Sequence, residues 1–258
     1  MSLNCNICTI FTLFCSDFSF IKILLLQYLQ FSTLVIKYKN NEMQMRVMIM
    51  LIDIIKILNT LSQRRRVFVS EADFQLELAW TIKEIYPSVD IRLEFCPAFN
   101  RKMHIDILVV MDGKWIPIEL KYKTKGCELT DNGEHFILKN HGAKDIGCYS
   151  YLHDIQRIEQ IKHKTPLFAE GYAIMLTNEL SYTKPPVREN CYYRAFSIEQ
   201  GAVKSGRLKW HNNTSPGTKK GIEAPITLNG KYTMQWQRYS VIDNTANGVF
   251  QYLVNRIE

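Results

Sequence analysis

Two apolar runs of this chain carry three charged residues, and this combination constrains the fold more than any other sequence feature. Residues 104–110 (HIDILVV) and 115–122 (WIPIELKY) have the composition of buried β-strands. Asp106 lies in the first run, and Glu119 and Lys121 lie in the second. Because a carboxylate among aliphatic side chains is costly unless it has a partner, the three charges are expected to compensate one another or to bind something.

A turn signal between the two runs predicts that they form a hairpin. Residues 111–114 (MDGK) contain the Asp-Gly pair that favours a tight β-turn. Folding there brings Asp106 close to Glu119. Because residues two apart on a strand share a face, Glu119 and Lys121 are expected to point the same way. The sequence therefore predicts two carboxylates and one ammonium at one place on a sheet.

This arrangement suits a divalent cation and the hydrolysis of a phosphodiester. Two adjacent carboxylates repel each other unless a cation or a proton lies between them. Mg²⁺, or Mn²⁺ in its place, prefers oxygen ligands, polarises a phosphoryl oxygen and lowers the pKa of a bound water. Lys121 would orient that water or stabilise charge on the phosphate. The alternative is a structural ion pair, because Glu-x-Lys alone is a common triplet.

At these residues the chain resembles the PD-(D/E)xK nucleases, which have a restriction-endonuclease-like fold. The resemblance implies a core of helix, three strands, helix and strand, with the Asp on the second strand and the Glu-x-Lys on the third. In this chain Ile105 stands where the motif often has Pro. The order can be laid on residues 70–177, with helices over 70–86 and 144–162, strands over 89–95 and 171–177, and the hairpin between them.

The expected fold is therefore α/β, with a restriction-endonuclease-like αβββαβ core, a mixed central sheet flanked by helices, and a β-rich C-terminal elaboration. We expect an atypical hydrophobic extension over residues 1–42 and a single nuclease-like domain over 43–258. The core of that domain covers about 68–177 and the elaboration about 178–258. In the elaboration, strands are predicted over 192–198, 226–228, 232–239 and 249–254, with a turn at Asn229-Gly230. They would extend the core sheet or form a small β appendage.

The first predicted helix supplies a further candidate ligand. Ser70 is a typical N-cap, with acidic residues in the turn that follows. The resemblance implies that a Glu of this helix approaches the metal, and Glu71 is the first candidate and Glu77 the second. The alternative for Glu71 is that the helix dipole alone favours an acid there. Gln75, one turn later, is a candidate contact to metal-bound water or DNA.

Basic residues near the motif and in the C-terminal part are candidate phosphate contacts. The net charge is +7, and residues 201–238 hold seven basic residues against one acidic residue. The alternatives are a solvated strand end and an ordinary hairpin tip. The second helix also carries Asp154 and Arg157, spaced for an intrahelical ion pair. The candidates for nucleic-acid binding are Lys123, Lys125, Lys144, Arg207, Lys209, Lys219 and Lys220, and His141 is a weaker candidate.

The N-terminal segment differs in composition from the rest. Residues 18–36 are mostly apolar, but six of the nineteen are polar, so a membrane span is not favoured. Three alternatives remain: an extension packed on the domain or on a partner, a membrane-associating segment, or a segment that is not a native part of the protein. The seven cysteines form no disulfide or zinc framework, which favours free thiols and a cytoplasmic location.

The sequence thus predicts a cytoplasmic, Mg²⁺-dependent nuclease acting on nucleic acid, with DNA favoured over RNA. Asp106, Glu119 and Glu71 would hold the metal, and Lys121 would assist the attacking water. A catalytically inactive nucleic-acid-binding module of the same fold is the alternative. A membrane-tethered scaffold is a third hypothesis, which rests only on residues 18–36. Homodimerisation and the form of the nucleic acid stay open.

Overall fold

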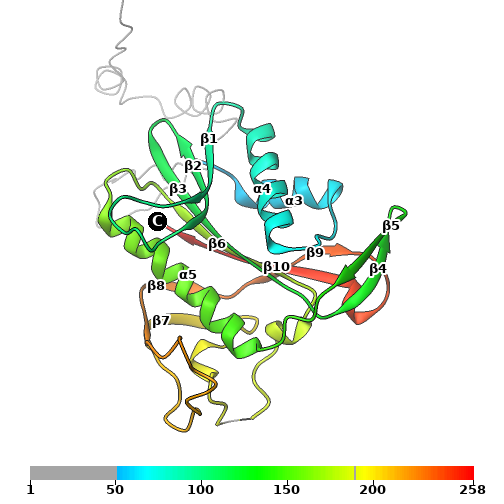
Figure 1. Cartoon of the computed structure of the whole chain (residues 1–258), viewed down its shortest axis with the longest axis vertical. Helices are drawn as coiled ribbons and strands as arrows, with labels where there is room; N and C mark the ends of the chain where they lie inside the picture. The colour runs from blue at the N-terminus through cyan, green and yellow to red at the C-terminus, as the bar shows by residue number, and fades with distance from the viewer. Residues whose placement is uncertain (1–50, 189) are drawn as a thin grey trace, which may run out of the picture. The chain divides into compact units, whose positions relative to one another are not determined.

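The computed structural model describes residues 51–188 and 190–258. We consider the compact unit Asp53–Glu258, shown in colour in Figure 1. Its helices are α3 (Ile54–Arg64), α4 (Glu71–Ile85) and α5 (Lys144–Lys164), with 3-10 turns η1 (Leu180–Thr183), η2 (Arg194–Phe196) and η3 (Ala246–Gly248). Its strands are β1 (Asp90–Phe95), β2 (Ile105–Met111), β3 (Lys114–Lys123), β4 (Cys127–Asp131), β5 (Glu134–Leu138), β6 (Gly171–Thr177), β7 (Val203–Leu208), β8 (Ile226–Thr233), β9 (Trp236–Val241) and β10 (Val249–Ile257).

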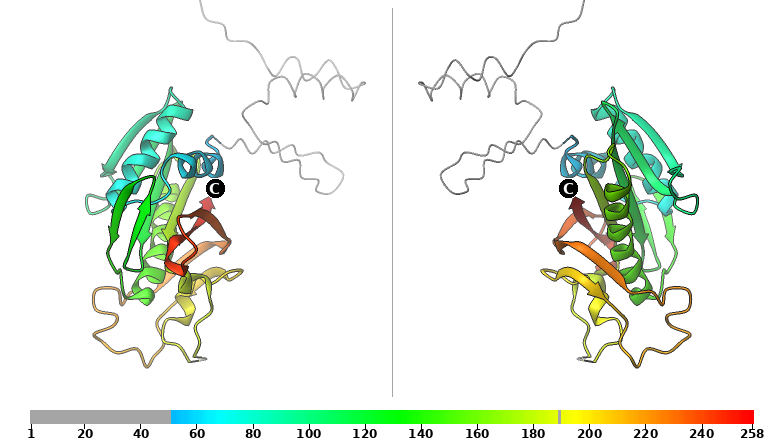
Figure 2. Two further views of the ribbon diagram at one scale, coloured as in Figure 1. Left: turned by 90° about the vertical axis from the view of Figure 1, so that its right-hand side faces the viewer. Right: turned by 90° about the vertical axis from the view of Figure 1, so that its left-hand side faces the viewer.

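A mixed six-stranded sheet forms the centre, in the order β1-β2-β3-β6-β10-β9. β3 and β6 are parallel, and the other neighbours are antiparallel. The side chains of β3 show which helix covers which face. The Tyr122 hydroxyl donates to the Phe68 carbonyl just before α4, whereas Lys121 reaches Asp154 of α5. Because successive residues of a strand point to opposite faces, α4 and α5 flank the sheet on opposite sides (Figure 2).

The predicted elements of the core are confirmed. The hairpin turns where the Asp-Gly pair predicts it, with positive φ at Asp112 and Gly113. Ser70 caps α4 by accepting a hydrogen bond from the Asp73 amide. β6 has the predicted bounds, and α5 runs two residues further than predicted, to Lys164. The architecture is α/β, with a mixed sheet between helices.

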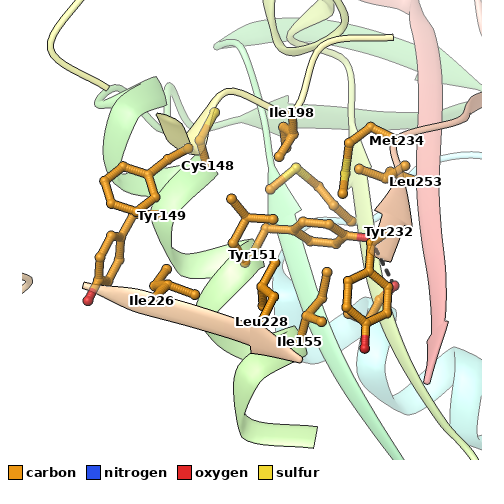
Figure 3. Packing of buried hydrophobic residues seen from close by; sticks show 14 of the residues in the cluster. Cys148, Tyr149, Tyr151, Ile155, Ile198, Ile226, Leu228, Tyr232, Met234 and Leu253 are labelled. Atoms are coloured by element: carbon orange, nitrogen blue, oxygen red, sulfur yellow. Dashed lines mark hydrogen bonds between the residues drawn. The ribbon is translucent and has the colours of Figure 1, made fainter. Parts of the chain in front are cut away.

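In the C-terminal part, some strands extend the core sheet and others form a small β appendage, so both predicted arrangements occur. β9 and β10 extend the central sheet, whereas β7 and β8 pair only with each other. β7, β8 and their connecting loop lie at the opposite end of the unit from α4 and β1 (Figure 2). A buried cluster joins this appendage to α5, with Tyr151 and Ile155 packed near Leu228 and Tyr232 (Figure 3).

Three predictions in this part are wrong. The strand predicted over 232–239 is divided at residues 234–235 between β8 and β9, which belong to different sheets. Residues 192–198 form turns and the short helix η2 rather than a strand. Phe196, Ser197 and Ile198 are buried in succession, which the two-sided geometry of a half-exposed strand does not allow. Asn229-Gly230 does not end a strand either, because both residues lie inside β8, where the pairing with β7 is irregular.

The side chain of Glu159 explains why Asn229-Gly230 forms a bulge instead of a turn. Its carboxylate is almost fully buried on α5 and accepts hydrogen bonds from the Asn229 amide (2.9 Å), the Gly230 amide (2.7 Å) and the Tyr232 hydroxyl (2.7 Å). These bonds satisfy the backbone donors that the irregular pairing leaves free.

Replacing Glu159 by alanine is therefore expected to lower the free energy of unfolding by about 3 kcal/mol, because several buried donors lose their acceptor together. Urea unfolding of the full chain, followed by circular dichroism, measures this change. Glu128→Ala is the control, since Glu128 is exposed on β4 and should change stability by less than about 0.5 kcal/mol. Equal stability of the two variants would contradict the role given to Glu159.

The predictions for residues 1–42, including the segment 18–36 and Cys5, Cys8 and Cys15, lie outside the described residues. Within the described residues, Cys96, Cys127, Cys148 and Cys191 are free thiols, as predicted. No helix in this described part combines the length and the apolar character that crossing a membrane requires.

Candidate active site

Asp106 and the Glu119-Leu120-Lys121 triplet lie side by side on β2 and β3. The register pairs Ile107 with Ile118, so its next step sets Asp106 opposite Glu119. The Oδ2 atom of Asp106 accepts a hydrogen bond from the Leu120 amide at 2.6 Å. The carboxylate of Asp106 is thereby held against the strand segment that carries both Glu119 and Lys121.

Glu71 reaches the same edge of β3 from the first turn of α4. Its Oε2 accepts a hydrogen bond from the Tyr122 amide at 2.7 Å, two residues beyond the Leu120 amide that Asp106 binds. The pairing of β2 with β3 ends at Ile107 and Ile118, so both amides lie beyond the paired part of β3. The two carboxylates therefore line this open edge. Glu77, the second candidate, forms an ion pair with Arg64 at 3.1 Å instead.

Asp154 and Arg157 of α5 complete the charged cluster, because they contact Lys121 and Glu119 of β3. The Asp154 Oδ2 atom lies 2.7 Å from the Lys121 ammonium. Arg157 lies 3.2 Å from Oε2 of Glu119 and 3.6 Å from Oδ1 of Asp154. The predicted intrahelical pair is confirmed, but its contacts to β3 were not predicted. The sequence does hold a signal for them, because Asp154 lies in the buried stripe of α5, three residues after Tyr151.

Glu119 is the least compensated charged group of the cluster. Its side chain has no exposed surface, and neither carboxylate oxygen has a hydrogen-bond partner among the described residues. The Arg157 guanidinium is close enough for an ion pair with Oε2, but not in hydrogen-bond geometry. An ionised carboxylate in this condition is costly, so Glu119 is expected either to take up a proton or to gain a cation as a partner.

Burial and charge determine the protonation of these groups. Burial raises the pKa of Asp106 to about 6. Burial, together with the charges of Asp154 and Asp106, raises the pKa of Glu119 well above its usual value. Burial alone would lower the pKa of Lys121, but Asp154, Asp106 and Glu71 together outweigh burial, and the pKa lies above the usual value. The Lys121 amine is therefore a cation at neutral pH.

The cluster carries more negative than positive groups. Its carboxylates are Glu71, Asp106, Glu119 and Asp154, and its cations are Lys121 and Arg157. Four carboxylates against two cations leave an excess of two negative charges when all are ionised. The raised pKa values of Asp106 and Glu119 mean that bound protons reduce this excess in the absence of a cation, and a divalent cation would take the place of those protons.

Gln75 supports Asp106 from α4. Its side-chain amide donates to the Asp106 carbonyl at 2.6 Å and to Oε1 of Glu94 at 2.8 Å. In this arrangement Gln75 positions the backbone of β2 next to the site. Its predicted contact to metal-bound water or DNA stays a prediction.

The basic candidates fall into two groups. Near the end of β3, Lys125 is half exposed and lies 3.5 Å from Glu179, and Lys123 lies near His141, whose pKa is lowered by burial and by that lysine. Lys144 donates to the Ser181 carbonyl at 2.6 Å and is engaged within the fold. The second group lies on β7 and the loop after it, where Arg207, Lys209 and Lys220 are exposed and Lys219 is partly buried.

The chain matches no protein-family model, no curated protein and no solved structure. Within residues 51–188 and 190–258, no three acidic, histidine or cysteine side chains converge closely enough to form a metal site by themselves. Mg²⁺ is commonly held by one or two carboxylates, with water and substrate phosphate supplying the other ligands. The pair Asp106 and Glu119 fits that type of donor set.

Proposed function

We propose that this protein is a metal-dependent nuclease of the restriction-endonuclease-like fold, which hydrolyses phosphodiester bonds in nucleic acid, with DNA as the first substrate to test. The observation that carries the proposal is the Glu119 carboxylate, which is fully buried and lacks hydrogen bonds next to Asp106 and Lys121. A divalent cation would compensate both carboxylates at once.

The order of elements supports this assignment. The chain runs α4, β1, β2, β3, α5 and β6, with β1 to β3 antiparallel and β6 parallel to β3. This is the order that the resemblance to PD-(D/E)xK nucleases implies, with the Asp on the second strand and the Glu-x-Lys on the third. The long insertion β4–β5 lies between β3 and α5 and leaves the order intact.

Each residue of the cluster has a role in the proposed reaction. Asp106 and Glu119 would hold Mg²⁺ or Mn²⁺, with Glu71 at the adjacent edge of β3. When bound, the cation supplies polarisation of the phosphoryl oxygen and a more acidic water. Because Lys121 is protonated, it would donate to a phosphate oxygen or to the attacking water rather than accept a proton. Asp154 orients its amine.

The basic surfaces would hold the nucleic-acid backbone. Lys123 and Lys125 lie at the end of β3 that carries the motif. Arg207, Lys209, Lys219 and Lys220 belong to a segment, residues 201–222, that contains no acidic residue. Such surfaces bind phosphate through counterion release, so nucleic-acid binding should weaken strongly as salt increases.

A second candidate function is an inactive nucleic-acid-binding module of the same fold. The observation that favours it is the internal pairing of the cluster, in which Asp154 engages Lys121 and Arg157 engages Glu119. In such a module these two ion pairs would persist, and no divalent cation would bind in their place.

The test is a panel of duplex, single-stranded and branched DNA and of RNA, incubated with the full chain in Mg²⁺, Mn²⁺ or EDTA. The nuclease proposal expects cleavage of at least one substrate with Mg²⁺ or Mn²⁺ and none with EDTA. Salt-sensitive binding without cleavage under any metal would support the inactive module instead. A lack of both binding and cleavage would overturn both candidates.

A further inference from the structure

Arg157 is placed between the candidate metal ligand Glu119 and two other acceptors. Its guanidinium lies 3.2 Å from Oε2 of Glu119 and 3.6 Å from Oδ1 of Asp154, and it donates to the His104 carbonyl. Its side chain is 20% exposed, while that of Glu119 has no exposed surface. Arg157 is thus the positive group nearest to Oε2 of Glu119 among the described ion pairs.

A guanidinium in this position opposes the binding of a second cation. Like charges a few Å apart repel strongly where water is largely excluded. A divalent cation that takes Glu119 as a ligand therefore has to displace Arg157 or bind beside it. Displacement is feasible because Arg157 keeps Asp154 and the His104 carbonyl as partners after leaving Glu119.

We propose that Arg157 competes with the divalent cation for Glu119 and thereby sets the cation affinity of the site. This inference rests on the proposed function, because it assumes a cation at Asp106 and Glu119. Arg157 is then an affinity-determining residue. It balances the charge of Glu119 when no metal is bound, and it raises the cation concentration at which the metal site fills. If Arg157 instead only positions Glu119 as a ligand, its loss would weaken cation binding, so the two roles predict opposite signs.

The chain contains a closely matched control pair. Arg256 lies 2.6 Å from Glu170, and the side chains are 23% and 2% exposed, against 20% and 0% for Arg157 and Glu119. Both pairs join a partly exposed arginine to a buried glutamate, but Glu170 lies outside the candidate active site. Arg256→Gln therefore controls for the general effect of breaking such a pair.

The experiment is titration of Mn²⁺ into the metal-free full-length chain by isothermal calorimetry, with thermal unfolding in parallel to verify folding. Arg157→Gln is expected to lower the Mn²⁺ dissociation constant at least tenfold. Arg157→Lys, which keeps the charge, should stay close to the wild type. Arg256→Gln should also leave the constant within about twofold, since additivity holds for distant sites.

The outcomes distinguish a failure of the proposed competition from a failure of the proposed metal site. If the wild type binds Mn²⁺ and Arg157→Gln binds it equally or more weakly, the competition is overturned and the metal site stands. If neither the wild type nor any variant binds Mn²⁺, the proposed metal-dependent function is overturned along with the competition. Tighter binding in Arg157→Gln alone supports both.

Discussion

In the proposed nuclease, Lys121→Met is expected to reduce the rate of Mg²⁺-dependent cleavage by about 10²–10³-fold, the typical effect of removing one charged group that stabilises a transition state. Lys121 is held protonated against Asp154 and lies on β3, two residues after the candidate ligand Glu119. Methionine removes the charge but keeps most of the volume. Single-turnover cleavage with enzyme in excess measures the effect. Because the variant keeps the proposed phosphate contacts of the basic surfaces, nucleic-acid affinity should change much less than the rate.

The control for this substitution is another buried lysine. Lys204 of β7 is mostly buried and its ammonium donates to the Ala195 carbonyl at 3.2 Å, outside the charged cluster. Lys204→Met should therefore reproduce any general cost of removing a buried ammonium, without the loss in rate. Equal cleavage rates for wild type and Lys121→Met would contradict the role given to Lys121. Equal losses in both lysine variants would assign the effect to stability.

Local signals were sufficient to predict the strands that carry the candidate site. The Asp-Gly turn and the apolar runs define the hairpin, and the period of two in a strand then places Glu119 and Lys121 on one face. Ser70 likewise determines where α4 begins. These interactions join residues close in sequence or follow directly from strand geometry. The approach of Glu71 to the Tyr122 amide is a tertiary contact, and it was expected only from the resemblance to the nucleases.

Other contacts between residues far apart in the sequence were not predicted, because no local pattern indicates them. Arg157 pairs with Glu119 across thirty-eight positions of the chain, and only the packing of α5 on the sheet creates that contact. Asn229-Gly230 is a strong local turn signal, but Glu159 from α5 supplies the acceptors that stabilise a bulge instead. Tertiary hydrogen bonds thus overrode the local propensity.

Asp154→Leu is expected to lower the free energy of unfolding by about 3–5 kcal/mol, because it leaves the buried ammonium of Lys121 without its carboxylate. The side chains of Asp154 and Lys121 are only 4% and 15% exposed, so water cannot replace the lost partner effectively. Guanidinium or urea unfolding of the metal-free chain measures the change. The expected loss is larger than for an exposed ion pair, because both partners are buried.

The double variant Lys121→Met/Asp154→Leu separates stability from activity. Replacing both members of a buried ion pair by apolar residues of similar volume is often neutral, so the double variant should recover most of the stability lost in Asp154→Leu. In the proposed nuclease it should nevertheless cleave as slowly as Lys121→Met, since the Lys121 charge is absent. If Asp154→Leu alone is as stable as the wild type, the 2.7 Å pair does not hold the ammonium in solution. If the double variant is stable and cleaves normally, Lys121 has a structural role only and other residues carry the cleavage, while the cleavage itself excludes the inactive module.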